Sequence, residues 1–200
     1  LRITFQNAKL LLGEWVLRRQ QKIDLIPKTI KRLQKDLNLN SPPNRIEAFD
    51  VSHLAGKDIV GSLVCFVNTK PKKSEYRRFQ IKTVLDNNDF ASMQEIVFRR
   101  YSRVLKDCGA LPDLILIDGG KGQLSVAFSV LKELGLEHIP IIGLAKRLEE
   151  VFIPGFKDSQ SIDKQSPGLI LLRKIRDEAH RFAISYQKKK RNSNMIKSPF

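Results

Sequence analysis

The chain has 200 residues, 42% of them hydrophobic, which suffices for one domain with a buried core and an appendage. Lys and Arg number 36 against 21 Asp and Glu, and the formal net charge of +15 indicates a polyanionic partner, most often nucleic acid. No apolar run approaches the roughly 18 residues that a membrane span needs, so we expect no membrane partner. The charge alone is also compatible with simple solubility and says nothing about chemistry.

The two cysteines, Cys65 and Cys108, do not have the spacing of a metal-binding knuckle. We interpret them as two buried thiols of a cytoplasmic protein, because the cytosol is reducing. The abrupt start at Leu1, without a signal-peptide pattern, suggests a segment of a longer protein.

Residues 1–44 are predicted to form an N-terminal helical arm or linker. Apolar residues cluster at helical spacing over 10–16, and a second helix carries Ile30, Leu33 and Leu37 on one face. The prolines at 42 and 43 end it. The arm could orient a neighbouring domain, but we favour a helical hairpin that packs on the main domain.

Residues 45–190 alternate strand and helix signals and are predicted to form an α/β domain. Strands are expected at 45–51, 59–67, 76–81, 114–117 and 139–144, with helices beginning near Asp89, after Gly120 and near Ser166. Short links between the first three strands predict an antiparallel meander, and the two helical crossovers predict a parallel half. The expected fold is therefore a mixed five-stranded sheet flanked by helices, followed by a polar tail at 191–200.

Asp50 and Asp118 lie at or near the ends of two apolar strands that we expect to be neighbours at the centre of the sheet. Two carboxylates bordering a core repel each other, and a hard divalent cation such as Mg²⁺ relieves that repulsion. Alternatively, Asp118 only caps the Asp-Gly-Gly turn and Asp50 pairs with a nearby arginine.

His180 lies in the last predicted helix, one step off its apolar stripe. A neutral imidazole can bind a metal or move a proton near neutral pH, although a lone helical histidine is more often a surface residue. Asp89 occupies the expected N-cap of the first long helix.

Basic residues lie close in sequence to these acids, and about half of them are expected to be solvated helix faces. Lys121 follows the glycine turn at a helix start, where phosphate is favoured. The candidate phosphate contacts, which would hold a backbone without reading sequence, are Lys72, Lys73, Arg77, Arg78, Lys121, Lys146, Arg147, Arg176 and Arg181.

Five blocks in this order resemble the C-terminal endonuclease region of the UvrC family, over residues 1 to about 190. The blocks are Ile46-Glu47-Ala48-Phe49-Asp50-Val51-Ser52-His53, Tyr76-Arg77-Arg78-Phe79, Leu114-Ile115-Leu116-Ile117-Asp118-Gly119-Gly120-Lys121-Gly122-Gln123, Gly143-Leu144-Ala145-Lys146-Arg147 with Glu149-Glu150-Val151-Phe152, and Arg176-Asp177-Glu178-Ala179-His180-Arg181-Phe182-Ala183.

The resemblance implies a ribonuclease-H-like fold and an Asp-Asp-His metal site, which falls on Asp50, Asp118 and His180. A further acidic residue of the family falls on Asp89. The implied activity is a Mg²⁺- or Mn²⁺-dependent DNA endonuclease that makes the 5′ incision at lesions in nucleotide excision repair, acting with UvrB and indirectly with UvrA.

The sequence also departs from the family pattern. The nuclease region that makes the 3′ cut and the segment that contacts UvrB are absent, and a helix-hairpin-helix module would begin after about Lys197. We therefore expect this chain alone to bind DNA weakly. Two alternatives remain open: a non-catalytic DNA-binding module with a degenerate nuclease fold, and a nuclease that acts on RNA hybrids.

Overall fold

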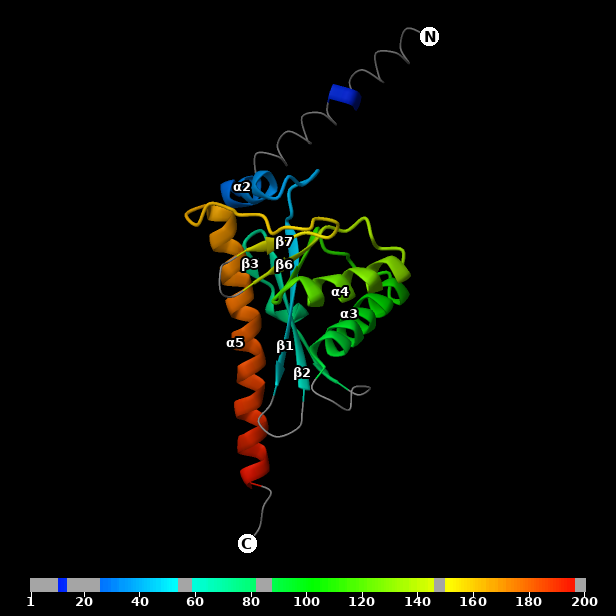
Figure 1. Ribbon diagram of the computed structural model, residues 1–200, viewed down its shortest axis with the longest axis vertical. Coiled ribbons are helices and arrows are strands. Elements are labelled where there is room, and N and C mark those ends of the chain that lie inside the picture. Colours follow the sequence, from blue (N-terminus) through cyan, green and yellow to red (C-terminus); the bar gives the residue numbers. More distant parts are fainter. Residues whose placement is uncertain (1–10, 14–25, 54–58, 82–87, 146–149, 197–200) are drawn as a thin grey trace.

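A computed structural model describes residues 11–13, 26–53, 59–81, 88–145 and 150–196, and shows one sheet with helices on both faces (Figure 1). The strands are β1 (Arg45–His53), β2 (Ile59–Val67), β3 (Lys70–Pro71), β4 (Arg77–Gln80), β5 (Leu114–Ile117), β6 (Ile141–Leu144) and β7 (Val151–Phe152). The helices are α2 (Lys28–Asp36), the short 3₁₀ helix η1 (Lys73–Glu75), α3 (Asp89–Lys106), α4 (Lys121–Glu133) and α5 (Pro167–Ile196).

The sheet has the order β3-β2-β1-β5-β6-β7, and β4 also pairs with β2. β1 pairs with β2 in antiparallel register and with β5 in parallel register, and β5 is parallel to β6. The predicted meander, the parallel half and the central adjacency of the first and fourth predicted strands are therefore confirmed. This adjacency matters for function because it places the ends of β1 and β5 side by side.

The described part of the sheet contains seven strands rather than the five expected. β3 lies within the short link expected between the second and third predicted strands, and β7 follows the fifth predicted strand. Each is two residues long, which is too short for an alternating pattern to be recognised.

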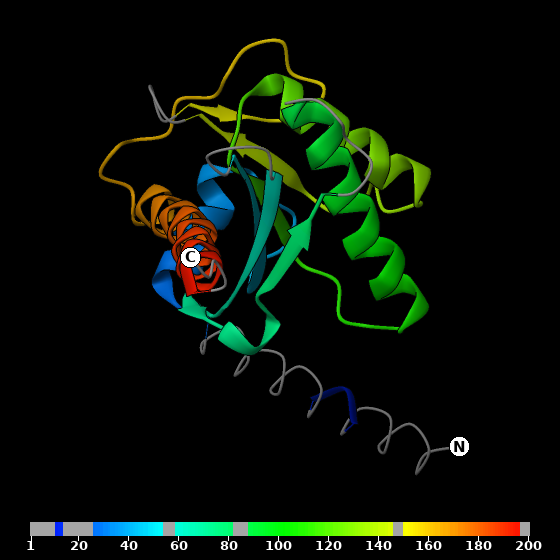
Figure 2. The ribbon, with the colours of Figure 1, turned by 90° about the horizontal axis from the view of Figure 1, so that it is seen from below.

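Alternating side chains of β1 supply two separate cores. Ile46 and Ala48 face a core formed with α2 and α5, whereas Phe49 faces a core formed with α3 and α4. Seen along the long axis, α5 covers one face of the sheet, and α3 and α4 cover the other (Figure 2). The two-residue period of the strand thus decides that Asp50, in step with Ile46 and Ala48, lies on the α5 face.

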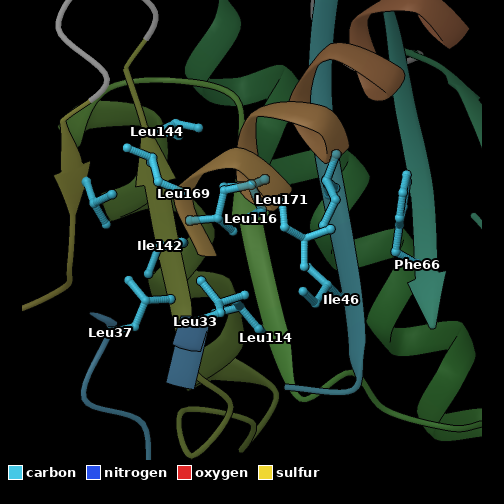
Figure 3. Close-up of a cluster of buried hydrophobic side chains, with 14 of the residues drawn as sticks. Leu33, Leu37, Ile46, Phe66, Leu114, Leu116, Ile142, Leu144, Leu169 and Leu171 are labelled. Atoms are coloured by element: carbon cyan, nitrogen blue, oxygen red, sulfur yellow. The ribbon is translucent and has the colours of Figure 1, made fainter. Parts of the chain in front are cut away.

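The predicted second helix of the arm is α2, and it belongs to the main domain. Leu33 and Leu37 are buried with Leu169 and Ile142 in the core beneath α5 (Figure 3). A Cβ built on Gly168 would lie 2.9 Å from the Cα of Leu33, so the absence of a side chain allows α5 to begin directly against α2. Of the expected helix at 10–16, residues 11–13 are described and are helical, and the rest lies outside the described residues.

Two further expectations differ from the structure. α5 continues to Ile196, into the segment 191–200 that was expected to be a polar tail. Cys65 is buried as expected, but Cys108 is exposed, because it lies just after the end of α3 with a left-handed backbone at φ 47°. Among the described residues, no helix is long and apolar enough to cross a membrane.

Candidate metal centre

Asp50 projects from the middle of β1 toward α5 and is only 2% exposed. The Ser52 hydroxyl, two residues along the same strand face, donates a hydrogen bond of 2.8 Å to Asp50 Oδ2. His180 Nδ1 lies 3.4 Å from the same oxygen. Among the described residues, the hydrogen-bonding partners of the buried Asp50 carboxylate are therefore a hydroxyl and an imidazole, and neither is a permanent cation.

Asp118 follows the last residue of β5 and is 7% exposed. Its backbone N–H donates to the carbonyl of Phe49 at 2.9 Å, which extends the β1–β5 ladder by one step. Because Phe49 pairs with Ile117, this bond holds Asp118 beside Asp50. The glycines at 119 and 120 then turn the chain into α4, whose first residue is Lys121.

His180 comes from α5, the last element of the domain, and its side chain is 45% exposed. Its neighbour Ala179 is fully buried against the sheet, so His180 lies at the border between the helix–sheet interface and solvent. A group at such a border can contact both a buried acid and a ligand arriving from solution.

Asp50, Asp118 and His180 each offer a ligand atom, and all three atoms lie within 4.8 Å of one another. Opposite ligands of an octahedral Mg²⁺ lie about 4.2 Å apart, so a shift of less than about 1 Å would let the three share one ion. The two carboxylates are the oxygen ligands that Mg²⁺ and Mn²⁺ prefer, and an imidazole is a common ligand of divalent transition metals. The residues present therefore fit a divalent cation.

Asp89 is placed differently from the sequence prediction. It is the first residue of α3, and the N-cap is Asn88, whose Oδ1 accepts from the N–H groups of Phe90 and Ala91 at 3.1 Å. Asn is at least as good an N-cap as Asp, so the helix begins one residue earlier than expected.

Asp89 is not a member of the three-residue group. Its neighbour Phe90 packs close to Gly122 at the start of α4, where a Cβ would meet the Phe90 ring at 2.5 Å. The start of α3 thus lies near the turn that follows Asp118.

The predicted phosphate contacts fall into different surroundings. Arg181 pairs with Glu178 through two bonds of 2.6 and 2.7 Å, which lowers the pKa of the Glu178 carboxyl, and Arg176 pairs with Asp177 at 3.0 Å. Lys121 Nζ donates to the carbonyl of Lys157 at 3.0 Å.

The remaining predicted contacts lie on or near β4. Lys72 pairs with Glu75 at 2.6 Å, and Arg77 donates to the carbonyls of Ser74 and Tyr76. Lys73 and Arg78 are also exposed, and Arg78 lies against α5. Lys146 and Arg147 lie outside the described residues.

The sequence analysis did not single out a second buried acid, Glu47, which is 0% exposed on the opposite face of β1. Arg100 donates two hydrogen bonds of 2.7 and 3.1 Å to the Glu47 carboxylate. Arg45 pairs with the same carboxylate at 2.8 Å, and the Tyr101 hydroxyl donates to it at 3.2 Å. The signal in the sequence was an acid inside an otherwise apolar strand. Its partners Arg100 and Tyr101 are adjacent residues of α3.

Glu47 also lies within 4.8 Å of Cys65 and Glu75, but this second group is a poor metal site. Arg45 binds both glutamates, so the carboxylates are already neutralised by the chain itself. Burial raises the pKa of the Cys65 thiol to about 12, which keeps it protonated and unsuited to ligation.

Comparisons with known proteins agree with this architecture. The family model described as the UvrC RNAse H endonuclease domain matches residues 34–184. UvrABC system protein C of Prosthecochloris aestuarii is 51% identical over 96% of this chain and 31% of its own length, and that of Salinibacter ruber is 47% identical over 98% and 32%. The chain thus spans about a third of the length of these relatives.

Among solved structures, endonuclease V from Streptomyces avermitilis is similar with a TM-score of 0.45 and 16% identity, over 80% of this chain and 91% of that one. Human endonuclease V is similar with a TM-score of 0.43 and 17% identity, over 68% and 63%. The family match and the relatives carry the assignment: the chain belongs to the family of UvrC RNase H endonuclease domains.

Proposed function

We propose that this chain is a divalent-metal-dependent endonuclease domain that hydrolyses a DNA phosphodiester at Asp50, Asp118 and His180. The observation that supports the proposal most directly is the convergence of two buried carboxylates and an imidazole, from three distant parts of the sequence, within 4.8 Å. Ions of the Mg²⁺ or Mn²⁺ kind are the proposed cofactor.

The three side chains would have separate roles. Asp50 and Asp118 would hold the cation, which when bound lowers the pKa of a water and stabilises charge on the phosphate oxygens. With Nδ1 donating to Asp50, His180 keeps a lone pair on Nε2, which can ligate the ion or accept a proton. Asp89 would assist from the rim.

The substrate is proposed to be duplex DNA that carries a lesion. The net charge of +15 supports a polyanionic substrate, and the predicted basic residues around the centre would contact phosphates rather than bases. From the names of the relatives, we infer that the whole protein acts in a UvrABC system. The resemblance of the sequence to the UvrC family supports the further proposal that this domain makes the 5′ incision, with UvrB and UvrA as partners. Residues 45–190 are proposed to be the catalytic unit.

The test is incision of a lesion-bearing duplex by UvrA, UvrB and full-length UvrC containing this chain with Asp118→Ala. We expect the 5′ incision rate to fall more than about 100-fold. Changing a residue that only orients a metal ligand already lowers metal affinity or activity about 10–100-fold, and Asp118 is a proposed ligand itself. Glu137→Gln, an exposed change on the same domain, is the control. Normal 5′ incision by the Asp118 variant would overturn the proposal and favour a non-catalytic DNA-binding module.

A further inference from the structure

Three residues on adjacent strands lie directly opposite one another on the α5 face of the sheet. Asp50 of β1 pairs in register with Ser62 of β2, and Ser62 pairs with Arg78 of β4. Residues directly opposite across antiparallel strands point to the same face. Asp50, Ser62 and Arg78 therefore form a cross-strand row that runs beneath α5.

Each member of the row contacts α5 within a short stretch around His180. Asp50 lies 3.4 Å from His180 Nδ1. The Ser62 hydroxyl donates to the carbonyl of Ala179 at 3.0 Å. The sheet thus holds the helix both at the imidazole and at the peptide unit that precedes it.

Arg78, at the outer end of the row, contacts the turn of α5 that follows His180. The Arg78 guanidinium lies 4.2 Å from the centre of the Phe182 ring, and it donates to the Ser185 hydroxyl at 3.1 Å. Tyr76 packs edge-on against the same ring at 5.1 Å, and its hydroxyl donates to Glu178 at 3.2 Å. Contacts to β2 and β4 therefore bracket His180 on both sides along α5.

The Ser62 bond is well suited to fixing the rotation of the helix. Ser62 is 0% exposed, so its hydroxyl would carry a desolvation cost if the bond to Ala179 were lost. A rotation of α5 by about 10° about its own axis would move an imidazole near the helix surface by about 1 Å. A displacement of this size is enough to disturb a metal site or a proton transfer.

We propose that Ser62 and Arg78 are positioning residues that set the His180 imidazole against Asp50. This inference rests on the proposed function, because it assigns the row a role in the geometry of the same centre. It also gives Arg78 a task within the domain that does not depend on contact with DNA.

The experiment measures Mn²⁺ affinity in the absence of DNA, together with kcat and KM for nicking, for Ser62→Ala and Arg78→Lys. We expect each change to weaken Mn²⁺ binding about 10-fold or more and to lower kcat, with little change in KM. The Arg78→Lys change keeps the positive charge but removes the planar stacking on Phe182. If Arg78 served only to contact phosphate, this change would leave the Mn²⁺ affinity measured without DNA unchanged.

Ser166→Ala is the matched control. Ser166 is also a buried serine whose hydroxyl bonds to a distant element, in this case Asp36 of α2. It precedes His180 by 14 positions, or about 21 Å along a helix. We expect this variant to lose thermal stability while it keeps the wild-type Mn²⁺ affinity.

The outcomes separate the two proposals. A wild-type protein that binds no Mn²⁺ would contradict the metal-dependent function itself. If the wild type binds Mn²⁺ and both variants bind it equally well, with only their melting temperatures lowered, the row is merely structural and the inference is wrong. If Ser62→Ala does not fold, the exposed Arg78→Lys change decides the question.

Discussion

Two buried acids of β1, three residues apart, show opposite ways of placing a carboxylate inside a protein. Glu47 faces α3, where Arg45, Arg100 and the Tyr101 hydroxyl surround it. Asp50 faces α5, where among the described residues its hydrogen-bonding partners are the Ser52 hydroxyl and His180, and a second acid, Asp118, lies nearby.

The difference explains why one acid is structural and the other a candidate metal ligand. A buried carboxylate is tolerated when charges of the chain itself neutralise it, as at Glu47. Two neighbouring carboxylates repel each other, and a divalent cation that binds between them relieves the repulsion. The α3 face of β1 therefore stabilises the fold, whereas the α5 face brings two carboxylates together at the place where we propose that a divalent cation binds.

The largest effect on stability is expected for Glu47→Gln. Two arginines would lose their shared carboxylate in a buried site, and breaking a buried ion pair in this way costs about 3–5 kcal/mol. Urea denaturation measures the loss, and the exposed Glu137→Gln change should stay within about 0.5 kcal/mol of wild type. A loss below about 1 kcal/mol for Glu47→Gln would show that the network is not the main support of this face.

A smaller effect, with the opposite pattern, is expected for Asp50→Asn. Without metal, its free energy of unfolding should equal or exceed that of wild type by up to about 1 kcal/mol, because the repulsion with Asp118 is removed. With Mn²⁺ at 100 times the dissociation constant, the wild type should gain about 2.7 kcal/mol and the variant nothing. Thermal unfolding with and without Mn²⁺ checks this, and an equal gain in both proteins would exclude Asp50 as a ligand.

The smallest effect concerns the edge of the Glu47 network and its dependence on pH. The hydrogen bond from Arg45 lowers the pKa of Glu75 from 4.5 to about 2, with Lys72 adding to it. Because the folded pKa is depressed, this contribution is complete above pH 4.5 and is lost as the pH falls from 4.5 toward 2.

Glu75→Gln should therefore cost up to about 1 kcal/mol at pH 7, since the pair is partly exposed, and progressively less below pH 4.5. Urea unfolding of both proteins between pH 7 and pH 3 gives the difference. A difference that is constant over this range would mean that the Glu75 charge does not contribute to folding.

Much of the fold followed from local patterns in the sequence. β2 matches its predicted range, and the helical spacing of Ile30, Leu33 and Leu37 predicted α2. The missed elements, β3 and β7, pair with the strands that precede them in the chain, β2 and β6, and at two residues each they are too short to show a pattern of their own. The first residue of α3 was misassigned because Asn88 and Asp89 are both good caps, and only the hydrogen bonds of Asn88 Oδ1 decide between them.

The sequence by itself determined the α/β class, the neighbouring strands that carry Asp50 and Asp118, and the family, because strand periodicity, strand order and motif spacing are local or nearly local properties. Only the tertiary structure decided which buried acid of β1 is neutralised, and that His180 lies 3.4 Å from Asp50. The physical reason is that both depend on the face of the sheet on which a helix packs and on its rotation there. These are set by contacts such as Ser62 to Ala179, between residues more than a hundred positions apart.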